Sequence, residues 1–350
     1  MIKALRVKDF TRFDDATLSF SRNLNVFVGQ NGTGKSQLMK LLYANLRSLM
    51  RGKDGQEVLS KTYLETAIAR KLKGVFRPDT LGRLTRRQQG QRRAEVEMTL
   101  RNHTSLAYSF STRSTEAVVV ETCPSAWNED LSVFLPTREM LSLYPNFVSI
   151  YESVDIPFEE TWRDLALMLG RPLRTGPRFK EISSLLAPLE AEDVLGGTVV
   201  LEHGRFYLRG AEGKLEAHLL AEGMRKIATI AQLIANGSLT QGSVLFWDEP
   251  EANLNPTLIR KVARTIMALM QQGTQVFIAT HSLFLLRELY LASHQDPCPG
   301  VPSYFSLIPE ENGRLRISSA QDINDLERLA SLDAQVAQDE QLLELFSHGI

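Results

Sequence analysis

A glycine-rich run near the amino terminus has the residue types that hold phosphate groups. Its sequence, Gly29-Gln30-Asn31-Gly32-Thr33-Gly34-Lys35-Ser36, fits the P-loop pattern G-x-x-x-x-G-K-[ST]. In this pattern the glycines let backbone N–H groups face phosphate oxygens, the lysine reaches the β- and γ-phosphates, and the serine hydroxyl can ligate Mg²⁺. The candidate nucleotide-binding residues are therefore Gly29, Asn31, Gly32, Thr33, Gly34, Lys35, Ser36 and the following Gln37.

Two carboxylates follow an apolar segment much later in the chain. Residues 244–247 are Val-Leu-Phe-Trp and lead into Asp248 and Glu249, as in a buried parallel strand. Such sheets bind ligands at the carboxyl ends of their strands. We expect Asp248 to hold Mg²⁺, directly or through water. We expect Glu249 to be the base that orients and deprotonates the attacking water.

A histidine ends the next apolar segment. Residues 275–280 lead into His281 and Ser282. A histidine at the carboxyl end of a strand could hydrogen-bond a γ-phosphate and sense its hydrolysis. The alternative is an ordinary helix start with Ser282 as the N-cap. The position of His281, one strand–helix unit after the carboxylates, favours the catalytic interpretation.

The elements that must position these residues are predicted from periodicity and turn signals. The expected strands cover 2–8, 17–28, parts of 95–122, 132–135, 198–202, 206–209, 244–247 and 275–279. A polar turn is expected at Asp14-Asp15. The expected helices cover the P-loop helix to about residue 50, then 56–73, most of 140–193, 222–236, 257–272 and a segment after His281. An acidic amphipathic helix, or a pair of helices, is expected at about 322–346.

The order of these motifs resembles the ATPases of the ABC/SMC/RecF superfamily, close to bacterial OLD-type and SMC-like standalone AAA-family ATPases. The P-loop, the Asp248-Glu249 strand, the D-loop Asn253-Leu254-Asn255-Pro256 and His281 carry the resemblance. It implies an α/β fold: an ABC-type P-loop ATPase head with a mixed parallel core sheet, an antiparallel side sheet and a compact helical lobe. It also implies ATP as the nucleotide, Mg²⁺ as cofactor, hydrolysis to ADP and phosphate, and nucleotide contact by Asn255.

The family's signature loop corresponds to Ala221-Glu222-Gly223-Met224-Arg225-Lys226. In the family this loop contacts the γ-phosphate held by a second subunit, so the resemblance implies a homodimer with shared ATP sites. Ala221 stands where the family has serine, and one hydroxyl contact is therefore missing. The N–H of Gly223, the helix dipole and the charge of Arg225 or Lys226 remain available. The alternative is an ordinary amphipathic helix start.

Two further positions are weaker candidates. Arg12 lies in the first strand–turn, where the family contacts adenine or the α-phosphate, although a solvated turn arginine is equally consistent with the sequence. Residues 134–139 lie where the family has its Q-loop, but they contain no glutamine. Arg138 or Glu139 is the candidate substitute.

The chain is expected to be one ABC-type ATPase domain, 1–350. Within it, 50–195 is predicted to be an inserted basic and helical lobe with antiparallel strands, and 322–350 an acidic helical tail. The stretch between Lys35 and Asp248 has no sustained heptads and no C-x-x-C hook, unlike full SMC proteins. Too few residues follow His281 for the TOPRIM nuclease domain of OLD nucleases. Any effector is therefore expected to be another chain.

Residues 70–93 form a basic stretch that is a candidate contact for DNA or RNA. Its cations are Arg70, Lys71, Lys73, Arg77, Arg83, Arg86, Arg87, Arg92 and Arg93. The alternative is a solvated arginine-rich loop. The net charge of −1 gives no global attraction to nucleic acid or membrane, so any such contact must be local.

Composition limits the compartment and the function classes. The chain has 43% apolar and 23% charged residues, and its only cysteines are Cys123 and Cys298. This indicates a soluble protein of a reducing cytoplasm, with no disulfide framework and no membrane partner. The favoured hypothesis is an ATP-dependent dimeric switch that controls a separate effector, an HNH or TOPRIM nuclease or a toxin, in bacterial antiphage defence. The alternatives are a RecF-like DNA-repair clamp and a scaffold that binds ATP without hydrolysis, against which Glu249 and His281 argue.

Overall fold

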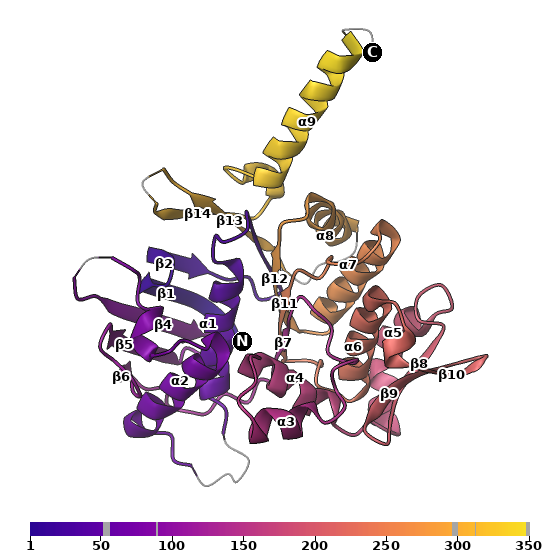
Figure 1. Ribbon diagram of the computed structural model, residues 1–350, viewed down its shortest axis with the longest axis horizontal. Coiled ribbons are helices and arrows are strands. Elements are labelled where there is room, and N and C mark those ends of the chain that lie inside the picture. The colour runs from indigo at the N-terminus through magenta and orange to yellow at the C-terminus, as the bar shows by residue number, and fades with distance from the viewer. Residues whose placement is uncertain (52–56, 89, 296–299, 312, 348–350) are drawn as a thin grey trace.

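The computed structural model describes residues 1–51, 57–88, 90–295, 300–311 and 313–347. Cys298, residues 52–56 of the predicted insertion and residues 348–350 of the predicted tail lie outside these ranges. The described residues form a mixed α/β structure with a central sheet and two flanking regions (Figure 1).

The central sheet has six strands in the order β14-β13-β3-β12-β11-β7. Neighbouring strands are parallel except for the β13–β14 pair. Their bounds are β3 (Leu24–Gly29), β7 (Ser132–Leu135), β11 (Val244–Asp248), β12 (Gln275–Thr280), β13 (Ser303–Pro309) and β14 (Leu315–Ala320). Strand β7 lies inside the predicted 50–195 insertion, yet it is an edge strand of this core sheet.

Helices cover both faces of the central sheet, which explains its continuous apolar strands. Side chains alternate along each strand, so Phe246 and Phe277 belong to the core on the α1 side, whereas Leu245 and Ile278 belong to the opposite core. The Phe246 and Phe277 rings stack with centroids 5.0 Å apart. The covering helices are α1 (Lys35–Ser48) on the first face and α6 (Glu222–Ala235), α7 (Pro256–Gln271) and α8 (Leu283–Gln295) on the second.

An antiparallel sheet in the order β2-β1-β4-β5-β6 flanks the α1 side. Its strands are β1 (Ile2–Phe10), β2 (Phe13–Ser19), β4 (Arg93–Leu100), β5 (Ser105–Ser111) and β6 (Val119–Thr122), accompanied by α2 (Lys61–Phe76) and the 3₁₀ turn η1 (Leu81–Leu84). The predicted turn at Asp14-Asp15 was wrong, because Phe10 pairs with Phe13 and the chain reverses at residues 11–12. The predicted strand 17–28 is also two strands, β2 and β3.

A helical lobe and a small sheet flank the other side. The lobe contains α3 (Phe147–Ser153), α4 (Glu160–Leu169) and α5 (Pro177–Glu190). The small sheet contains the predicted hairpin, β8 (Gly197–Glu202) and β9 (Arg205–Gly210), and a third strand, β10 (Gly213–Glu216), that was not predicted; the 3₁₀ turn η2 (Ala217–Leu219) follows.

The carboxyl-terminal segment leaves the body of the molecule. After the 3₁₀ turn η3 (Ile323–Asp325), helix α9 (Ala330–Ser347) projects outward (Figure 1). Residues 333–344 of α9 are exposed, and its charged residues there are all acidic. Among the described residues, no helix has the length and apolar character needed to span a bilayer.

Candidate nucleotide site

Three neighbouring strands bring the predicted motifs to one edge of the central sheet. Strand β12 pairs with β3 on one side and with β11 on the other, all in parallel. The carboxyl ends of these strands carry the P-loop after β3, Asp248 at the end of β11, and His281 directly after β12. The edge therefore gathers the predicted phosphate-binding loop, the predicted metal ligand Asp248 and His281 from three distant parts of the sequence.

The P-loop has backbone angles that require glycine. The φ angles of Gly29, Gly32 and Gly34 are 154°, 78° and 97°. A Cβ at Gly29 would lie 2.8 Å from the carbonyl oxygen of Leu307, and one at Gly34 would lie 3.1 Å from the Phe13 ring. The loop leads directly into the N-terminus of α1, where free N–H groups and the helix dipole favour an anion.

Lys35 lies inside the curl of this loop. Its Nζ donates hydrogen bonds to the carbonyl oxygens of Gly29 at 2.7 Å and Gln30 at 3.0 Å. Thr33 Oγ1 donates to the same Gln30 oxygen at 2.8 Å. Burial lowers the pKa of Lys35, although the nearby negative charge of Glu249 opposes this shift. Asn31 and Gly32 are exposed at the tip of the loop.

Ser36 and Asp248, the two predicted Mg²⁺ ligands, are in contact. Ser36 Oγ donates a hydrogen bond to Asp248 Oδ1 at 2.9 Å. Burial raises the pKa of Asp248 to about 6, and the Ser36 hydrogen bond only partly opposes this effect. On the same helix, the Oε1 atom of Gln37 is buried and has no hydrogen-bond partner among the described residues. A hard divalent cation fits this set of oxygen donors.

Glu249 and His281 are the second predicted pair that the structure brings together. Glu249 Oε1 lies 3.1 Å from His281 Nδ1. Glu249 has a φ of 47°, which is unusual for a residue with a side chain, and its N–H donates to the Ala279 carbonyl oxygen at 2.9 Å. This backbone bond ties the turn to β12, so the strained conformation is supported by the neighbouring strand.

A third acid was not given a role in the sequence analysis. Glu251 is buried, accepts a hydrogen bond from Thr280 Oγ1 at 2.6 Å, and lies 3.9 Å from His281 Nδ1. Its only signal in the sequence is its closeness to Asp248 and Glu249. Glu251 links the carboxylate turn to the end of β12 and thereby helps to position His281.

The signature segment contacts the D-loop of its own chain. A Cβ at Gly223 would lie 2.8 Å from Leu254 Cδ2 and 2.9 Å from the Asn253 carbonyl oxygen. Lys226 is buried and donates a hydrogen bond to the carbonyl oxygen of Ala252 at 2.7 Å. The first turn of α6 is thus fixed to the loop that follows Glu249. Ala221, at the N-cap position, makes no side-chain cap.

Arg225 is paired with the candidate Q-loop residue Glu139. Arg225 Nε donates to Glu139 Oε1 at 2.7 Å, and its Nη1 donates to the carbonyl oxygen of Leu220. Glu139 is buried and also accepts a hydrogen bond from the Ser142 backbone N–H at 3.1 Å. Two positions predicted separately therefore form one ion pair, which sequence spacing could not reveal.

Asn255 and Arg12 take no part in the contacts described above for the P-loop, the carboxylates and His281. Asn255 is the N-cap of α7, and its side chain accepts a hydrogen bond from the Leu258 N–H at 2.9 Å. Arg12 is exposed in the β1–β2 turn and forms no ion pair with any described residue. This turn is held beside the P-loop because Phe13 packs against Gly34.

Most cations of the basic stretch 70–93 are neutralised within the chain. The pairs are Lys71 with Glu160 and Asp164, Lys73 with Glu116, Arg77 with Asp155, Arg86 with Asp14, Arg92 with Asp9 and Arg93 with Glu121. Arg70, Arg83 and Arg87 form no ion pair within the part of the chain that the structure describes. Among the described residues of this stretch, these three arginines are the ones whose charge has no ion-pair partner.

Comparison with family models gives two matches. Residues 75–287 match the model described as "AAA domain, putative AbiEii toxin, Type IV TA system", which covers more than half of the chain. Residues 1–80 match the model described as "AAA ATPase domain". No curated protein matches the sequence.

Solved structures of SMC heads are similar in fold. One is the crystal structure of the SmcHead bound to the C-winged helix domain of ScpA, with a TM-score of 0.57 and 13% identity, covering 91% of this chain and 97% of that chain. Another is an Smc head domain with an extended coiled coil bound to the C-terminal domain of ScpA derived from Pyrococcus furiosus. Its TM-score is 0.50 at 11% identity, covering 97% of this chain and 99% of that chain. At these identities the likeness concerns the fold, and it confirms the expected ABC-type P-loop ATPase head.

Proposed function

Because the chain belongs to the AAA-domain family whose model spans residues 75–287, we propose that it is an ATP-hydrolysing switch subunit. It acts as an ATP-dependent homodimer that controls a separate effector. One observation carries the proposal: the Ser36–Asp248 contact and the Glu249–His281 contact lie at one sheet edge, beside the P-loop. Phosphate binding, metal binding and base catalysis need these groups together.

Binding of ATP uses groups that the loop already presents. The inward-facing N–H groups of the glycine-rich loop and the α1 N-terminus hold the phosphates. Lys35 exchanges its bonds to the carbonyls of Gly29 and Gln30 for the β- and γ-phosphate oxygens. Arg12, which is exposed in the β1–β2 turn, would contact adenine or the α-phosphate, as the family resemblance implies.

The metal site is supported by the state of Asp248. A buried carboxylate whose pKa is raised to about 6 is poorly compensated by its single serine partner. When bound there, Mg²⁺ would neutralise charge on the β- and γ-phosphates. Ser36 and Asp248 would hold it, and the gain in charge compensation would keep Asp248 ionised.

Hydrolysis is assigned to Glu249, with His281 as its partner. Glu249 would orient a water molecule and take its proton, since its carboxylate lies at the open edge of the sheet with its side chain 25% exposed. His281 touches the same carboxylate and would hydrogen-bond the γ-phosphate. A contact of this kind links the state of the nucleotide to the turn after β12 and so to α8.

The dimer is proposed from the signature segment. Gly223 and the N-terminus of α6 would complete the ATP site of a second copy, with Arg225 leaving Glu139 to meet the γ-phosphate. Because Gly223 is packed on the D-loop, a change in this contact would reach Glu249 through Ala252 and Lys226. Each subunit would thereby sense the nucleotide bound to the other.

Control of a separate effector is proposed from the comparisons. The matching family description names a toxin of a Type IV toxin–antitoxin system, and both SMC-head structures are bound to a domain of another protein, ScpA. The toxin named in the family description and the bound partner domains support an ATPase head that regulates a separate toxin or nuclease chain, with antiphage defence as the proposed setting. The cytoplasm is the compartment in which such a system would act.

The assembly is tested by measuring molar mass in solution with and without Mg·ATP. Glu249→Gln should shift from monomer to dimer on adding ATP, because it binds ATP and hydrolyses it slowly. Lys35→Ala should remain monomeric, and Glu97→Gln, an exposed glutamate of β4, should behave as the wild type. If the molar mass of Glu249→Gln is the same with and without ATP, the proposed ATP-dependent dimer is contradicted.

Complementation tests the shared site. Arg225→Gln and Glu249→Gln proteins should each hydrolyse ATP poorly alone, and their mixture should recover part of the wild-type rate. In a mixed dimer one site carries both substitutions and the other carries neither. A mixture whose rate is no higher than the average of its two components would contradict catalysis in trans. A pull-down of the neighbouring gene product by Glu249→Gln, with and without ATP, then tests the effector.

A further inference from the structure

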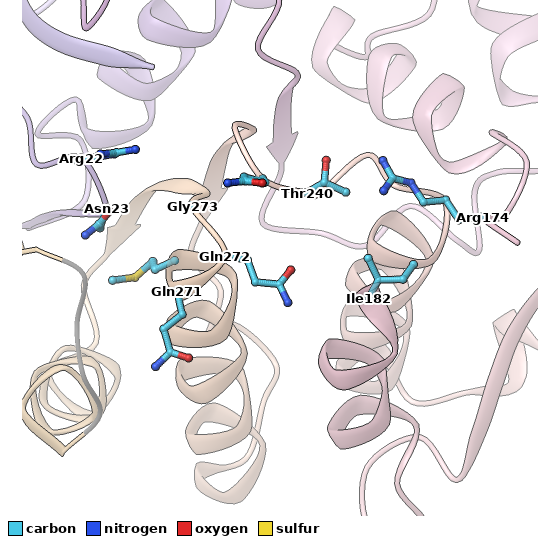
Figure 2. Close-up of a pocket in the computed structure, with 10 residues that line it drawn as sticks. Arg22, Asn23, Arg174, Ile182, Thr240, Gln271, Gln272 and Gly273 are labelled. Atoms are coloured by element: carbon cyan, nitrogen blue, oxygen red, sulfur yellow. The ribbon is translucent and has the colours of Figure 1, made fainter. Parts of the chain in front are cut away.

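A second pocket lies at the edge of the central sheet opposite to the P-loop. It encloses about 700 Å³ and is lined by the turns that precede β3, β11 and β12, together with the end of α7 (Figure 2). Asn23, Thr240 and Gly273 come from these turns. Because the three strands are parallel, this pocket and the candidate ATP site are at opposite ends of the same strands.

The pocket has positive charge without internal compensation. Arg22 and Arg174 stand on opposite sides of it (Figure 2), and none of the lining residues that the structure describes is acidic. Within the described ranges, neither arginine forms an ion pair. Burial lowers the pKa of the neighbouring Arg101, and the charge of Arg22 adds to that shift.

Arg174 is held in place by the protein. Its backbone N–H donates to the carbonyl oxygen of Ala235 at 2.9 Å. Its side chain lies against Gly237, where a Cβ would be 1.9 Å from the Arg174 Nε atom. Gly237 has a φ of 76° and follows the C-terminus of α6, so a glycine is required there both for the turn and for this contact.

Neutral polar and apolar side chains complete the pocket. Gln241, Gln271 and Gln272 also line the pocket, and each carboxamide can both donate and accept hydrogen bonds. Asn23 is only 3% exposed, and its Nδ2 group has no hydrogen-bond partner among the described residues. Buried Met270 adds apolar surface. The lining is therefore mostly polar, with the two arginines and several hydrogen-bonding groups beside a small apolar surface.

We propose that this pocket binds a small organic ligand with two phosphate groups separated by one nucleoside-sized body. Arginine is suited to phosphate because its planar guanidinium can donate two parallel hydrogen bonds. Two arginines on opposite sides favour two separated anionic groups, and the carboxamides that line the pocket would hydrogen-bond the polar edges of a base. The volume falls in the range of ligand pockets, about 300–1,000 Å³.

The test uses adenosine 3′,5′-bisphosphate as the probe and calorimetry as the measurement. Lys35→Ala protein is used throughout, so that binding at the P-loop does not contribute. Arg22→Gln and Arg174→Gln should each weaken binding about tenfold or more, since each removes a charge-assisted hydrogen-bond pair. Arg264→Gln, an exposed arginine of α7 outside the pocket, is the matched control and should change nothing.

Several outcomes would overturn the assignment. The probe could fail to bind at millimolar concentration. Arg264→Gln could also weaken binding as much as Arg174→Gln does. Affinity that rises with the length of an added oligonucleotide would also contradict a small-ligand pocket. Equal thermal midpoints of the variants establish that losses of affinity do not come from unfolding. Because ATP hydrolysis is not measured, the result is independent of the function proposed above.

Discussion

Two buried aspartates in this protein have opposite electrostatic settings. Asp164 of α4 accepts hydrogen bonds from Tyr43 at 2.6 Å and Lys71 at 3.0 Å, and Arg47 lies 3.5 Å away. Burial favours protonation of Asp164, but the charges of Lys71 and Arg47 outweigh it and hold its pKa below the usual value. Among the described residues, Asp248 is hydrogen-bonded by the Ser36 hydroxyl alone. Burial raises its pKa to about 6, and the Ser36 bond and the charges of Lys40 and Lys35 oppose this only in part.

The contrast distinguishes a structural carboxylate from a functional one. The cations around Asp164 are Arg47 of α1, Lys71 of α2 and Arg163 of α4 itself, so the ion cluster joins three helices with charges of this chain. Asp248 is buried with its charge poorly compensated, at the sheet edge where the P-loop begins. Such a group is stabilised when a cation binds, which is the behaviour expected of a metal ligand.

The largest expected difference is in ATP hydrolysis. Asp248→Asn should lower the rate by about a hundredfold or more, because a metal ligand is lost. Asp164→Asn should keep the rate per folded molecule within a few-fold of wild type. Steady-state phosphate release, normalised to the folded fraction, measures both. If the hydrolysis rate falls equally in the two variants, the distinction between a functional Asp248 and a structural Asp164 is wrong.

Stability should change in opposite directions. Asp164→Asn should lower the free energy of unfolding by about 3 kcal/mol, because buried cations lose their partner. Asp248→Asn should raise it by about 2 kcal/mol at pH 8 without Mg²⁺, because the cost of burying a charge disappears. Urea unfolding measures both values. A destabilised Asp248→Asn protein would show that the carboxylate is structural.

The pH dependence sharpens the same contrast. The folded-state pKa of Asp248 is raised from 3.8 to about 6, so protonation stabilises the folded wild type. This contribution is complete below pH 3.8 and is lost as the pH rises through 6. The advantage of Asp248→Asn should therefore be full at pH 8 and shrink between pH 6 and pH 4. A difference in thermal midpoint that stays constant across this range would contradict the raised pKa.

The smallest effect is expected in nucleic-acid binding. Arg83 and Arg87 have uncommitted charge, whereas Arg86 is paired with Asp14. If the stretch contacts phosphates, replacing Arg83 and Arg87 by glutamine should reduce the salt slope of DNA affinity by about one unit per lost contact. If the wild-type protein shows no salt-sensitive DNA binding, this stretch does not bind nucleic acid. The main support for a RecF-like clamp is then lost as well.

The motifs at the sheet edge were predictable from the sequence, whereas the side-chain contacts around them were not. The P-loop, the Asp248-Glu249 strand and His281 depend on local patterns, and parallel pairing then brings them together. The resemblance to ABC/SMC-type AAA ATPases is confirmed by the family and fold comparisons. The pairing of Arg225 with Glu139 and the cluster around Asp164 depend on contacts between distant segments, which periodicity does not encode.

Two local errors have identifiable causes. The β1–β2 turn was placed at acidic residues, but β2 is half-exposed and tolerates Asp14 and Asp15, while the left-handed Thr11 makes the reversal. The third strand of the small sheet, β10, is mostly exposed and polar and therefore lacked an alternating apolar signal.

Single-turnover hydrolysis by Glu249→Gln tests the central claim most directly. ATP binding should remain near wild type, because Lys35 and Ser36 are intact, and the hydrolysis rate should fall about a hundredfold or more. Lys35→Ala should lose binding itself and serves as the contrasting variant. A Glu249→Gln protein that hydrolyses bound ATP at the wild-type rate would contradict the assignment of the catalytic base and, with it, the account of this site.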